Sequence, residues 1–484
     1  MTDLRPVGYV IGWLVALLGV AMAFPAGVDL IDGDPNASAF LGAMVVTLTT
    51  GCAIGLACAN GRRPAHRLST TQGFTITTVA WLVFTAFATL PLTLGAPHLD
   101  FVDALFETTS AMTTSGGTVI VGLDHMPRSV LLWRGLLQWI GGLGVVLFAI
   151  ILLPLFGVGG MQLLRAADFN TLDKILPRAK EIALAFGAVY LFLSIACALG
   201  YAWAGMSAFD AAVHSMATIA TGGMANYDAS FGGFPPATHY VGTIFMLLGG
   251  MSFVRFVQFA AGHPRPLFAD SQIQAFLLIY AIFAAGLLIA RLLNGDALSE
   301  PVLREVLFNL ASIQTTTGFA STDYTKWGSF AVALFFCVGL ICGCSGSTAG
   351  GPKVFRYQLL LSAVASEMRR LHSPNSVHVM RYQGRRVSPE VIDSVMGFFM
   401  LFFLTVGVGA VALVLLGLDP VTAISGATAC ISNIGPGLGP VIGPAGNFAT
   451  VPDPAKLVFT FLMLVGRLEI MTVYVLCTAA FWRA

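Results

Sequence analysis

Residues 101–117 read FVDALFETTSAMTTSGG, an amphipathic stretch that ends in a Thr/Ser-rich pair and a glycine. Three later stretches repeat this arrangement, and each of the four lies between two long hydrophobic runs. Four copies of a membrane span, a short helix, a glycine turn and a second span would allow one chain to surround a central pore. The repeat therefore predicts an ion pathway. The later stretches are AFDAAVHSMATIATGG at 208–223, REVLFNLASIQTTTG at 304–318 and VTAISGATACISNIG at 421–435.

The composition of the chain is that of a membrane protein. Of its 484 residues, 56% are hydrophobic and only 10% are charged, against about 25% charged residues in a typical soluble domain. We therefore predict an all-α polytopic membrane protein whose first apolar run is a retained helix and not a signal peptide. The eight cysteines have no zinc-type spacing and are interpreted as small buried residues. Ten apolar runs are predicted to form spans, at roughly 7–28, 38–58, 74–96, 130–156, 182–204, 238–262, 271–293, 329–366, 391–418 and 455–481.

The charged residues predict the orientation of the chain. The loops at 59–73, 157–181, 262–270 and 353–390, with the two termini, hold 17 of the 25 Lys and Arg residues, whereas the opposite side holds five. By the positive-inside rule, these loops and both termini lie in the cytoplasm. The outer loops and short helices hold 15 of the 24 Asp and Glu residues. We expect this negative outer mouth to concentrate cations.

The four stretches share one interval. The same thirteen positions separate the first turn of each short helix from a glycine, which selects Gly223 over Gly222 in the second stretch. A helix of thirteen residues is about 20 Å long, too short to span, and its C-terminal end would direct partial negative charge at a cation. The strand that follows can turn its carbonyls inward, and glycine permits the backbone angles required. The predicted filter residues are Thr114, Ser115, Gly116, Thr221, Gly222, Gly223, Thr316, Thr317, Gly318, Asn433, Ile434 and Gly435.

Two features inside the spans depart from simple apolar helices. The run at 329–366 is too long for one helix and contains CGCSGSTAGG at 342–351. Irregular backbone is tolerated at membrane depth only where protein encloses it or where it lines a cavity; the alternative is a glycine-rich kink for close helix packing. Arg467 lies midway in the last predicted span, so we expect it to face the pore or a partner.

Other polar residues in the spans are interpreted as structural. Glu107, His214 and Asn309 occupy equivalent positions in three short helices, where we expect scaffold contacts behind the filter. Gln138 and Gln258, in second helices of repeats, are interpreted as packing residues.

These stretches resemble the TrkH/TrkG/KtrB superfamily of potassium transporters, most closely its TrkH branch, over essentially the full length. The resemblance implies four M1–P–M2 repeats around one central pore, two extra N-terminal transmembrane helices and one filter glycine per repeat. It also implies a pore that prefers potassium and admits rubidium, caesium and some sodium. Pro352 stands where the family usually has a β-branched residue. The resemblance rests on LFETTSAMTTSGGTV (105–119), ATIATGGMANYD (217–228), NLASIQTTTGFAST (309–322), CGCSGSTAGGPKVFR (342–356), SNIGPGLGP (432–440) and GRLEI (466–470).

The resemblance implies an organisation and a gate. The chain would divide into two N-terminal membrane helices and four repeats, at 1–70, 71–165, 166–268, 269–370 and 371–484. Only the third repeat is expected to have a broken second helix. In the family, the corresponding intramembrane loop lies just below the filter, with the arginine in the cavity beside it. The expected gate residues are Cys342, Gly343, Cys344, Ser345, Gly346, Ser347, Thr348, Ala349, Gly350, Gly351 and Arg467.

The chain contains no GxxxxGK[ST] motif and no strand-linked GxGxxG motif, so we expect no nucleotide site in it. The resemblance implies regulation by a cytosolic ring of TrkA-type subunits that bind NAD or ATP. The basic loop 353–390 and the segment 161–181 are the docking candidates. The resemblance also implies a homodimer in a bacterial cytoplasmic (inner) membrane, with the potassium ion as ligand and no nucleic-acid partner.

The predicted function is potassium uptake through a gated, moderately selective pore, and three alternatives are considered. A secondary transporter with broken helices would show two inverted halves rather than four repeats. A sodium- or proton-coupled symporter of KtrB type would lack the two extra N-terminal helices. A membrane-embedded enzyme would need a motif such as HExxH, and no such cluster lies in any span, so we expect a protein that is not an enzyme.

Overall fold

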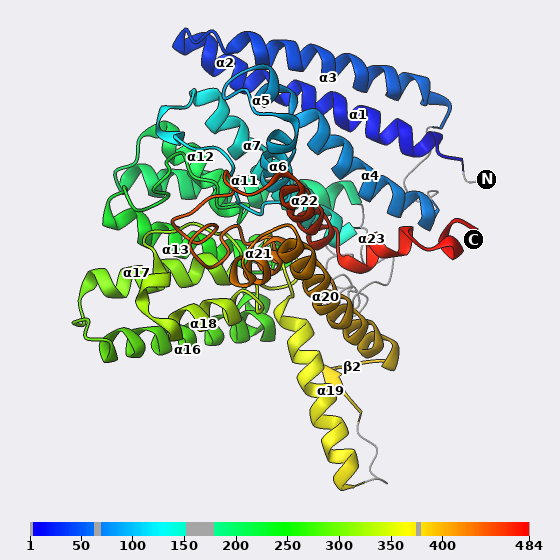
Figure 1. The fold of residues 1–484 in the computed structure, drawn as a ribbon. Helices are drawn as coiled ribbons and strands as arrows, with labels where there is room; N and C mark the ends of the chain where they lie inside the picture. Colours follow the sequence, from blue (N-terminus) through cyan, green and yellow to red (C-terminus); the bar gives the residue numbers. More distant parts are fainter. Residues whose placement is uncertain (1–2, 62–68, 152–178, 374–378, 484) are drawn as a thin grey trace.

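The protein is almost entirely helical in the computed structural model, which describes residues 3–61, 69–151, 179–373 and 379–483 (Figure 1). The prediction of an all-α polytopic membrane protein is confirmed. Within the described residues, the strands are limited to an antiparallel hairpin of β1 (Arg381–Tyr382) and β2 (Arg385–Arg386). Six basic residues that predicted the orientation lie outside the described residues, as does most of the docking candidate 161–181: Arg62, Arg63, Arg67, Arg165, Lys174 and Arg178.

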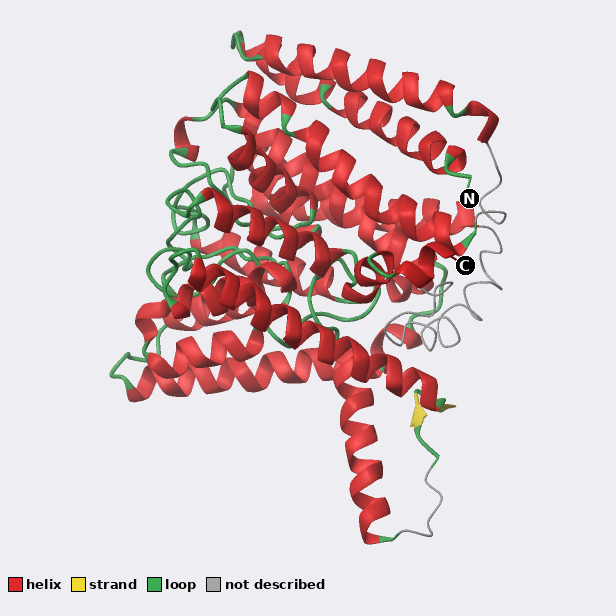
Figure 2. Ribbon diagram, turned by 45° about the vertical axis from the view of Figure 1, so that its right-hand side comes forward, coloured by secondary structure: helices red, strands yellow, loops and turns green. Residues whose placement is uncertain are grey.

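Two antiparallel helical rods from the N-terminus lie along one edge of the molecule (Figures 1 and 2). The first is α1 (Arg5–Ala21), which continues into α2 (Ala23–Asp32), and the second is α3 (Ala37–Ala57). Glycines allow their close approach, because a Cβ atom on Gly12 would lie only 2.4 Å from the backbone nitrogen of Gly55. These are the two extra N-terminal helices that the sequence predicts.

Four short helices recur along the rest of the chain, each between two other helical segments. They are α6 (Phe101–Met112), α12 (Ala208–Ile219), α17 (Glu300–Gln314) and α21 (Pro420–Ser432). The helices before them are α4 (Thr70–Ala88) with α5 (Leu90–Leu94), α11 (Ala179–Trp203), α16 (Ser271–Leu293) and α20 (Pro389–Leu415). The helices after them are α7 (Arg128–Ile151), α13 (Pro236–Gly250), α18 (Ser329–Val338) and α22 (Asp453–Arg467). Smaller elements connect these: η1 (Ala59–Gly61), η3 (Leu123–His125), α15 (Arg265–Ala269), η5 (Tyr324–Trp327) and α24 (Ala479–Arg483).

Side-chain caps fix the start of three short helices. Asp100 accepts a hydrogen bond from the backbone of Asp103 at 2.8 Å, and Ser207 accepts one from Asp210 at 3.0 Å. Asp419 accepts bonds from the backbone of residues 421 and 422 at 3.0 Å, and hydrogen bonding from Thr422 lowers the pKa of its carboxyl group. Because caps satisfy the free N–H groups of the first turn, they set where each helix begins relative to its glycine.

All ten predicted apolar runs contain helices, but three of them are broken. Seven spans in the described part of the chain are long and apolar enough to cross a membrane. Two more are bent pairs: α13 with α14 (Phe253–Ala260), at 92°, and α22 with α23 (Ile470–Leu476), at 107°. The remaining run, 329–366, divides into α18 and α19 (Val354–His372). The expectation that only the third repeat has a broken helix is therefore wrong.

Hydrogen bonds from the irregular segment 342–351 explain the bend between α13 and α14. The carbonyl of Gly250, at the end of α13, accepts a bond from the backbone nitrogen of Cys344 at 2.8 Å. The first backbone nitrogen of α14, on Phe253, donates to the carbonyl of Gly346 at 2.9 Å. These groups would be unsatisfied at the ends of two half-helices in a membrane, and the segment supplies their partners.

A helix, α19, and not a loop occupies the first half of the segment 353–390. Figures 1 and 2 show α19 extending away from the body of the protein. Its first turn, however, is inside the protein. Arg356 is buried and bonds Glu469 at 2.7 Å, and its guanidinium lies 3.7 Å from the centroid of the Phe398 ring. Glu469 has a φ of 64° and precedes α23, so this ion pair stabilises the second bend.

Candidate functional site

The four short helices end in the same turn. In each, the backbone nitrogen of the residue just before the predicted filter glycine donates to the carbonyl five residues earlier, at 2.8 to 2.9 Å. The residue before that one has a left-handed backbone, with φ between 50° and 58°. Threonine fills this position in three turns, although a β-branched residue rarely adopts this conformation, and asparagine, which adopts it more readily, fills it in the fourth. The left-handed residues are Thr114, Thr221, Thr316 and Asn433.

The glycine two positions later is also left-handed in every turn. The φ angles are 89° at Gly116, 76° at Gly223, 89° at Gly318 and 95° at Gly435. Gly222 does not share this conformation, so the interval of thirteen residues identifies the equivalent glycine correctly. A side chain would be strained here, which explains why glycine recurs.

The four turns meet in a closed ring. A Cβ atom on Gly116 would lie 2.4 Å from the carbonyl oxygen of residue 222, and one on Gly223 would lie 1.8 Å from that of residue 317. The same holds for Gly318 against the carbonyl of residue 434, at 2.0 Å, and for Gly435 against that of residue 115, at 2.7 Å. Each turn therefore contacts the next one, and the fourth contacts the first. The sequence predicts the members of this ring but not its closure.

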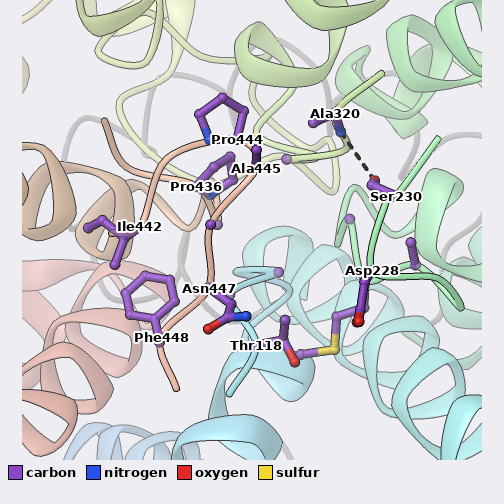
Figure 3. A pocket seen from close by; sticks show the side chains of 18 of the residues that line it. Thr118, Asp228, Ser230, Ala320, Pro436, Ile442, Pro444, Ala445, Asn447 and Phe448 are labelled. Carbon is purple, nitrogen blue, oxygen red and sulfur yellow. Dashed lines mark hydrogen bonds between the residues drawn. The ribbon is translucent and has the colours of Figure 1, made fainter. Parts of the chain in front are cut away.

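A cavity of about 150 Å³ opens onto the ring (Figure 3). All four glycines line it, together with segments that follow them in the chain and a loop at 442–448. Figure 3 shows the second and third repeats joined at its edge, where the Ser230 hydroxyl accepts a 3.2 Å bond from the backbone of Ala320. Asp228 is the one carboxylate among the described residues of the lining. The ring thus lies at the bottom of a shallow polar vestibule.

Most of the carboxylates predicted to lie on the outer side are engaged by neighbours. Asp32 pairs with Arg128 at 3.1 Å, and Asp103 pairs with Lys456. The Asp228 oxygens accept hydrogen bonds from the backbone of residues 122 and 123, at 2.8 and 3.1 Å. The negative outer mouth expected from the charge count is therefore made mainly of paired or hydrogen-bonded groups.

Each short helix holds the strand that follows its glycine. A side chain of the helix accepts a hydrogen bond from the backbone nitrogen three residues after the glycine. Glu107, His214 and Asn309 make the scaffold contacts that the sequence predicts. In the fourth repeat, where Gly426 takes the equivalent position, Ser425 takes over this contact. The pairs are Glu107 with Val119 (2.9 Å), His214 with Asn226 (3.3 Å), Asn309 with Ser321 (3.0 Å) and Ser425 with Leu438 (2.9 Å).

Glu107 also forms a buried ion pair with Arg134 of α7, at 2.8 Å. Both side chains are buried, and Arg134 donates a second bond to the carbonyl of Ala225, at 2.9 Å. We expect Glu107→Ala to lower the free energy of unfolding by about 3–5 kcal/mol, because it leaves a buried charge without its partner. Thermal unfolding of the purified protein in detergent measures the loss.

The matched control is Asp32→Ala, which removes a partner from the exposed pair with Arg128. It should cost at most about 1 kcal/mol. An equal, small effect of both substitutions would contradict the role given to Glu107.

The segment 342–351 lies directly against the ends of the short helices. Its residues 342–350 are buried. The Thr348 hydroxyl lies 2.9 Å from the carbonyl of Ile219, at the end of α12, and 3.0 Å from that of Gly249. The backbone nitrogen of Gly350 donates to the hydroxyl of Thr316, a residue of the third turn, at 2.7 Å. The structure thus brings the predicted gate segment and the predicted filter into contact.

Two cationic side chains hold this segment. Arg467 is the last residue of α22, so it lies at the bend and not in the middle of a straight span as the sequence predicts. It donates through Nη1 to the carbonyl of Thr348 at 3.0 Å. Its Nε and Nη2 have no hydrogen-bond partner among the described residues. Lys353 donates through Nζ to the carbonyls of Gly350, at 3.1 Å, and Ala349. The charge count places Lys353 in the cytoplasmic loop, and only its position two residues after the glycine-rich motif indicates another role.

Four glycine-containing turns that close one ring inside an all-helical membrane protein define the class: a membrane transport protein with a single central ion path. All four turns come from one chain, whereas a pore made of identical subunits with one turn each would need four chains.

The comparisons with known proteins identify the family. The TrkH family, described as a cation transport protein, matches residues 38–483. The Trk system potassium uptake protein TrkI of Halomonas elongata is 41% identical over 97% of this chain and 95% of its own length. The TrkH of Vibrio parahaemolyticus is 38% identical over 99% of both chains. The crystal structure of the potassium transporter TrkH from that organism matches all of both chains, with a TM-score of 0.91 and 36% identity. This chain belongs to the TrkH family of cation transport proteins.

Proposed function

We propose that this protein takes up potassium across the membrane through the ring of four turns. The observation that carries the proposal is the cyclic contact of Gly116, Gly223, Gly318 and Gly435 with the carbonyls of their neighbours. Carbonyl oxygens arranged around one axis can replace the hydration shell of a cation. The names of the relatives, which are potassium uptake proteins, support potassium as that cation.

Each part of the ring contributes to cation binding. The short helices direct their C-terminal ends, which carry partial negative charge, at the ring. One glycine per repeat leaves room for few ion sites in series, so we propose moderate rather than strict selectivity. A membrane potential of 100 mV, negative inside, supplies about 2.3 kcal/mol for each potassium ion that enters.

The segment 342–351 is proposed as the gate. Its contacts with Thr316 and with the end of α12 support a closed position directly behind the ring. The Arg467 guanidinium in the same region adds a positive charge that raises the barrier for a cation. Movement of this segment would open the path. The gated unit is the third of the four proposed repeats, at 269–370.

Regulation is proposed to come from another polypeptide. The relatives are components of Trk systems, which supports a partnership with other proteins of such a system. We propose a cytosolic ring of TrkA-like subunits that bind NAD or ATP, and a homodimer of complete pores. The far end of α19 carries Arg369, Arg370 and His372 in its last turn and offers a cationic docking surface. Both termini, which lie close together in Figures 1 and 2, are proposed to be on the cytoplasmic side of a bacterial inner membrane.

Flux measurements in liposomes test the function. The purified protein, reconstituted with an inside-negative potential, should accumulate potassium faster than sodium, and the cytosolic partner should increase the rate. Protein-free liposomes provide the background. Equal uptake of both cations would contradict the filter as proposed.

A further inference from the structure

Two of the four filter turns are held by a pair of their own hydroxyl groups. In the first, the hydroxyls of Thr113 and Ser115 hydrogen-bond at 2.9 Å. In the third, Thr315 and Thr317 do the same at 2.7 Å. Each pair ties the end of a short helix to the segment that carries the ring carbonyl. The fourth turn is held from outside itself, because Asn433 donates through Nδ2 to the Ser115 hydroxyl of the first turn at 2.8 Å and to a carbonyl of α22.

The second turn has no such pair. The positions of the two hydroxyls are taken by Ala220 and Gly222, which have no polar side chain. Within the described part of the chain, the Thr221 hydroxyl between them bonds only the carbonyl of Ala220, one residue earlier, at 2.7 Å. The second strand therefore lacks the side-chain tie that its neighbours have.

Gln138 of α7 supplies the missing tie from outside the repeat. Its Nε2 donates to the carbonyl of Gly222 at 2.6 Å, and its Oε1 accepts a bond from the backbone nitrogen of Met224 at 3.3 Å. The Gln138 amide thus bonds the residues immediately before and after Gly223. The side chain is completely buried. A Cβ atom on Gly222 would lie 2.5 Å from the amide carbon of Gln138, so the absence of a side chain at 222 makes room for this contact.

The bond to Gly222 acts on the ring itself. The Gly222 carbonyl is one of its four members, because it is the oxygen that would contact a Cβ atom on Gly116. A carbonyl oxygen has two lone pairs, so it can accept from Gln138 and still face a cation. The bond fixes the direction of this carbonyl and restricts how far it can move inward to coordinate a smaller ion.

We propose that Gln138 is a positioning residue for the second filter strand and that it determines how well the ring discriminates potassium from sodium. This inference rests on the proposed function. A merely structural glutamine would affect the amount of folded protein and the uptake of all cations alike. A positioning residue changes the ratio between cations.

The test compares Gln138→Met and Gln138→Leu with the unaltered protein in liposomes, measuring potassium and sodium uptake separately. Both replacements fill the buried site with an apolar side chain, and neither can donate to the carbonyl of Gly222. Both should lower the potassium-to-sodium ratio by about five- to tenfold, as the loss of one hydrogen bond in a discriminating site does. The rate of potassium uptake should fall by a smaller factor than this ratio does. The control is Gln258→Met, a buried glutamine of α14 that bonds Arg255, which should leave the ratio unchanged.

The outcomes separate the inference from the function on which it rests. If the unaltered protein prefers potassium and both variants keep that preference, the inference is wrong. It is also wrong if both variants fold poorly or lose the uptake of both cations in equal proportion. If the unaltered protein itself takes up both ions equally, the proposed function fails, whatever Gln138 does.

Discussion

Gly223→Ala is expected to reduce potassium uptake by roughly ten- to a hundredfold, since each tenfold corresponds to about 1.4 kcal/mol and a left-handed alanine alone costs about 1–2 kcal/mol. The backbone at this position has a φ of 76°. A Cβ atom would lie 1.8 Å from the carbonyl oxygen of Thr317, so that ring carbonyl must also move. Uptake in liposomes, normalised to the amount of folded protein, measures the effect.

The control for this substitution is Gly144→Ala in α7, where an added Cβ atom meets no other atom within 4 Å. Its uptake should equal that of the unaltered protein. Unaltered uptake by the Gly223 variant would show that the ring is not on the ion path.

Arg467→Ala is expected to increase potassium uptake several-fold in the absence of a cytosolic partner. The substitution removes the 3.0 Å bond to the carbonyl of Thr348, and a bond of this charged kind contributes about 1.5–3 kcal/mol. It also removes a positive charge from the proposed path. Both effects favour an open gate, so uptake into liposomes should rise when it is measured with rubidium in place of potassium.

Arg467→Lys serves as the comparison, because it keeps the charge while changing the hydrogen-bond geometry. Its uptake should lie between those of the alanine variant and the unaltered protein. Unchanged or lower uptake by the alanine variant at normal expression would contradict a gating role for Arg467.

The features that could be predicted from the sequence are the local ones. The interval of thirteen residues identifies Gly116 and its equivalents, because all four short helices end in the same turn; their starts vary, since α17 begins at Glu300, five residues before the position that the interval uses. The scaffold contacts of Glu107, His214 and Asn309 follow from their equal position in that interval. The direct contacts between neighbouring turns do not follow, because they join segments far apart in the chain, such as Gly435 and the carbonyl of Ser115.

The bends in the second and fourth repeats could not be predicted from hydropathy. An apolar average over 238–262 is the same for a straight helix and for two half-helices. What decides between them is the segment 342–351, whose backbone bonds Gly250 and Phe253. Arg356 was likewise assigned to a loop, because its charge is visible in the sequence and its partner Glu469 lies 113 positions away.

Gln138 shows the same limit within the site. In the sequence it is a polar residue in an apolar helix, and packing is the ordinary interpretation. Its partners, Gly222 and Met224, belong to the next repeat. A signal does exist in the sequence, since the second turn lacks the hydroxyl pair of the first and third. The missing hydroxyl pair becomes informative only when the position of α7 beside the second turn is known.

The four turns are expected to form one cation site, and anomalous X-ray scattering from crystals of the protein grown with rubidium can locate it. A rubidium peak should be enclosed by the carbonyls of Ser115, Gly222, Thr317 and Ile434. Excess potassium should weaken this peak more than excess sodium does. Well-ordered density for the four turns with no rubidium between them, or rubidium bound only elsewhere in the protein, would contradict this expectation.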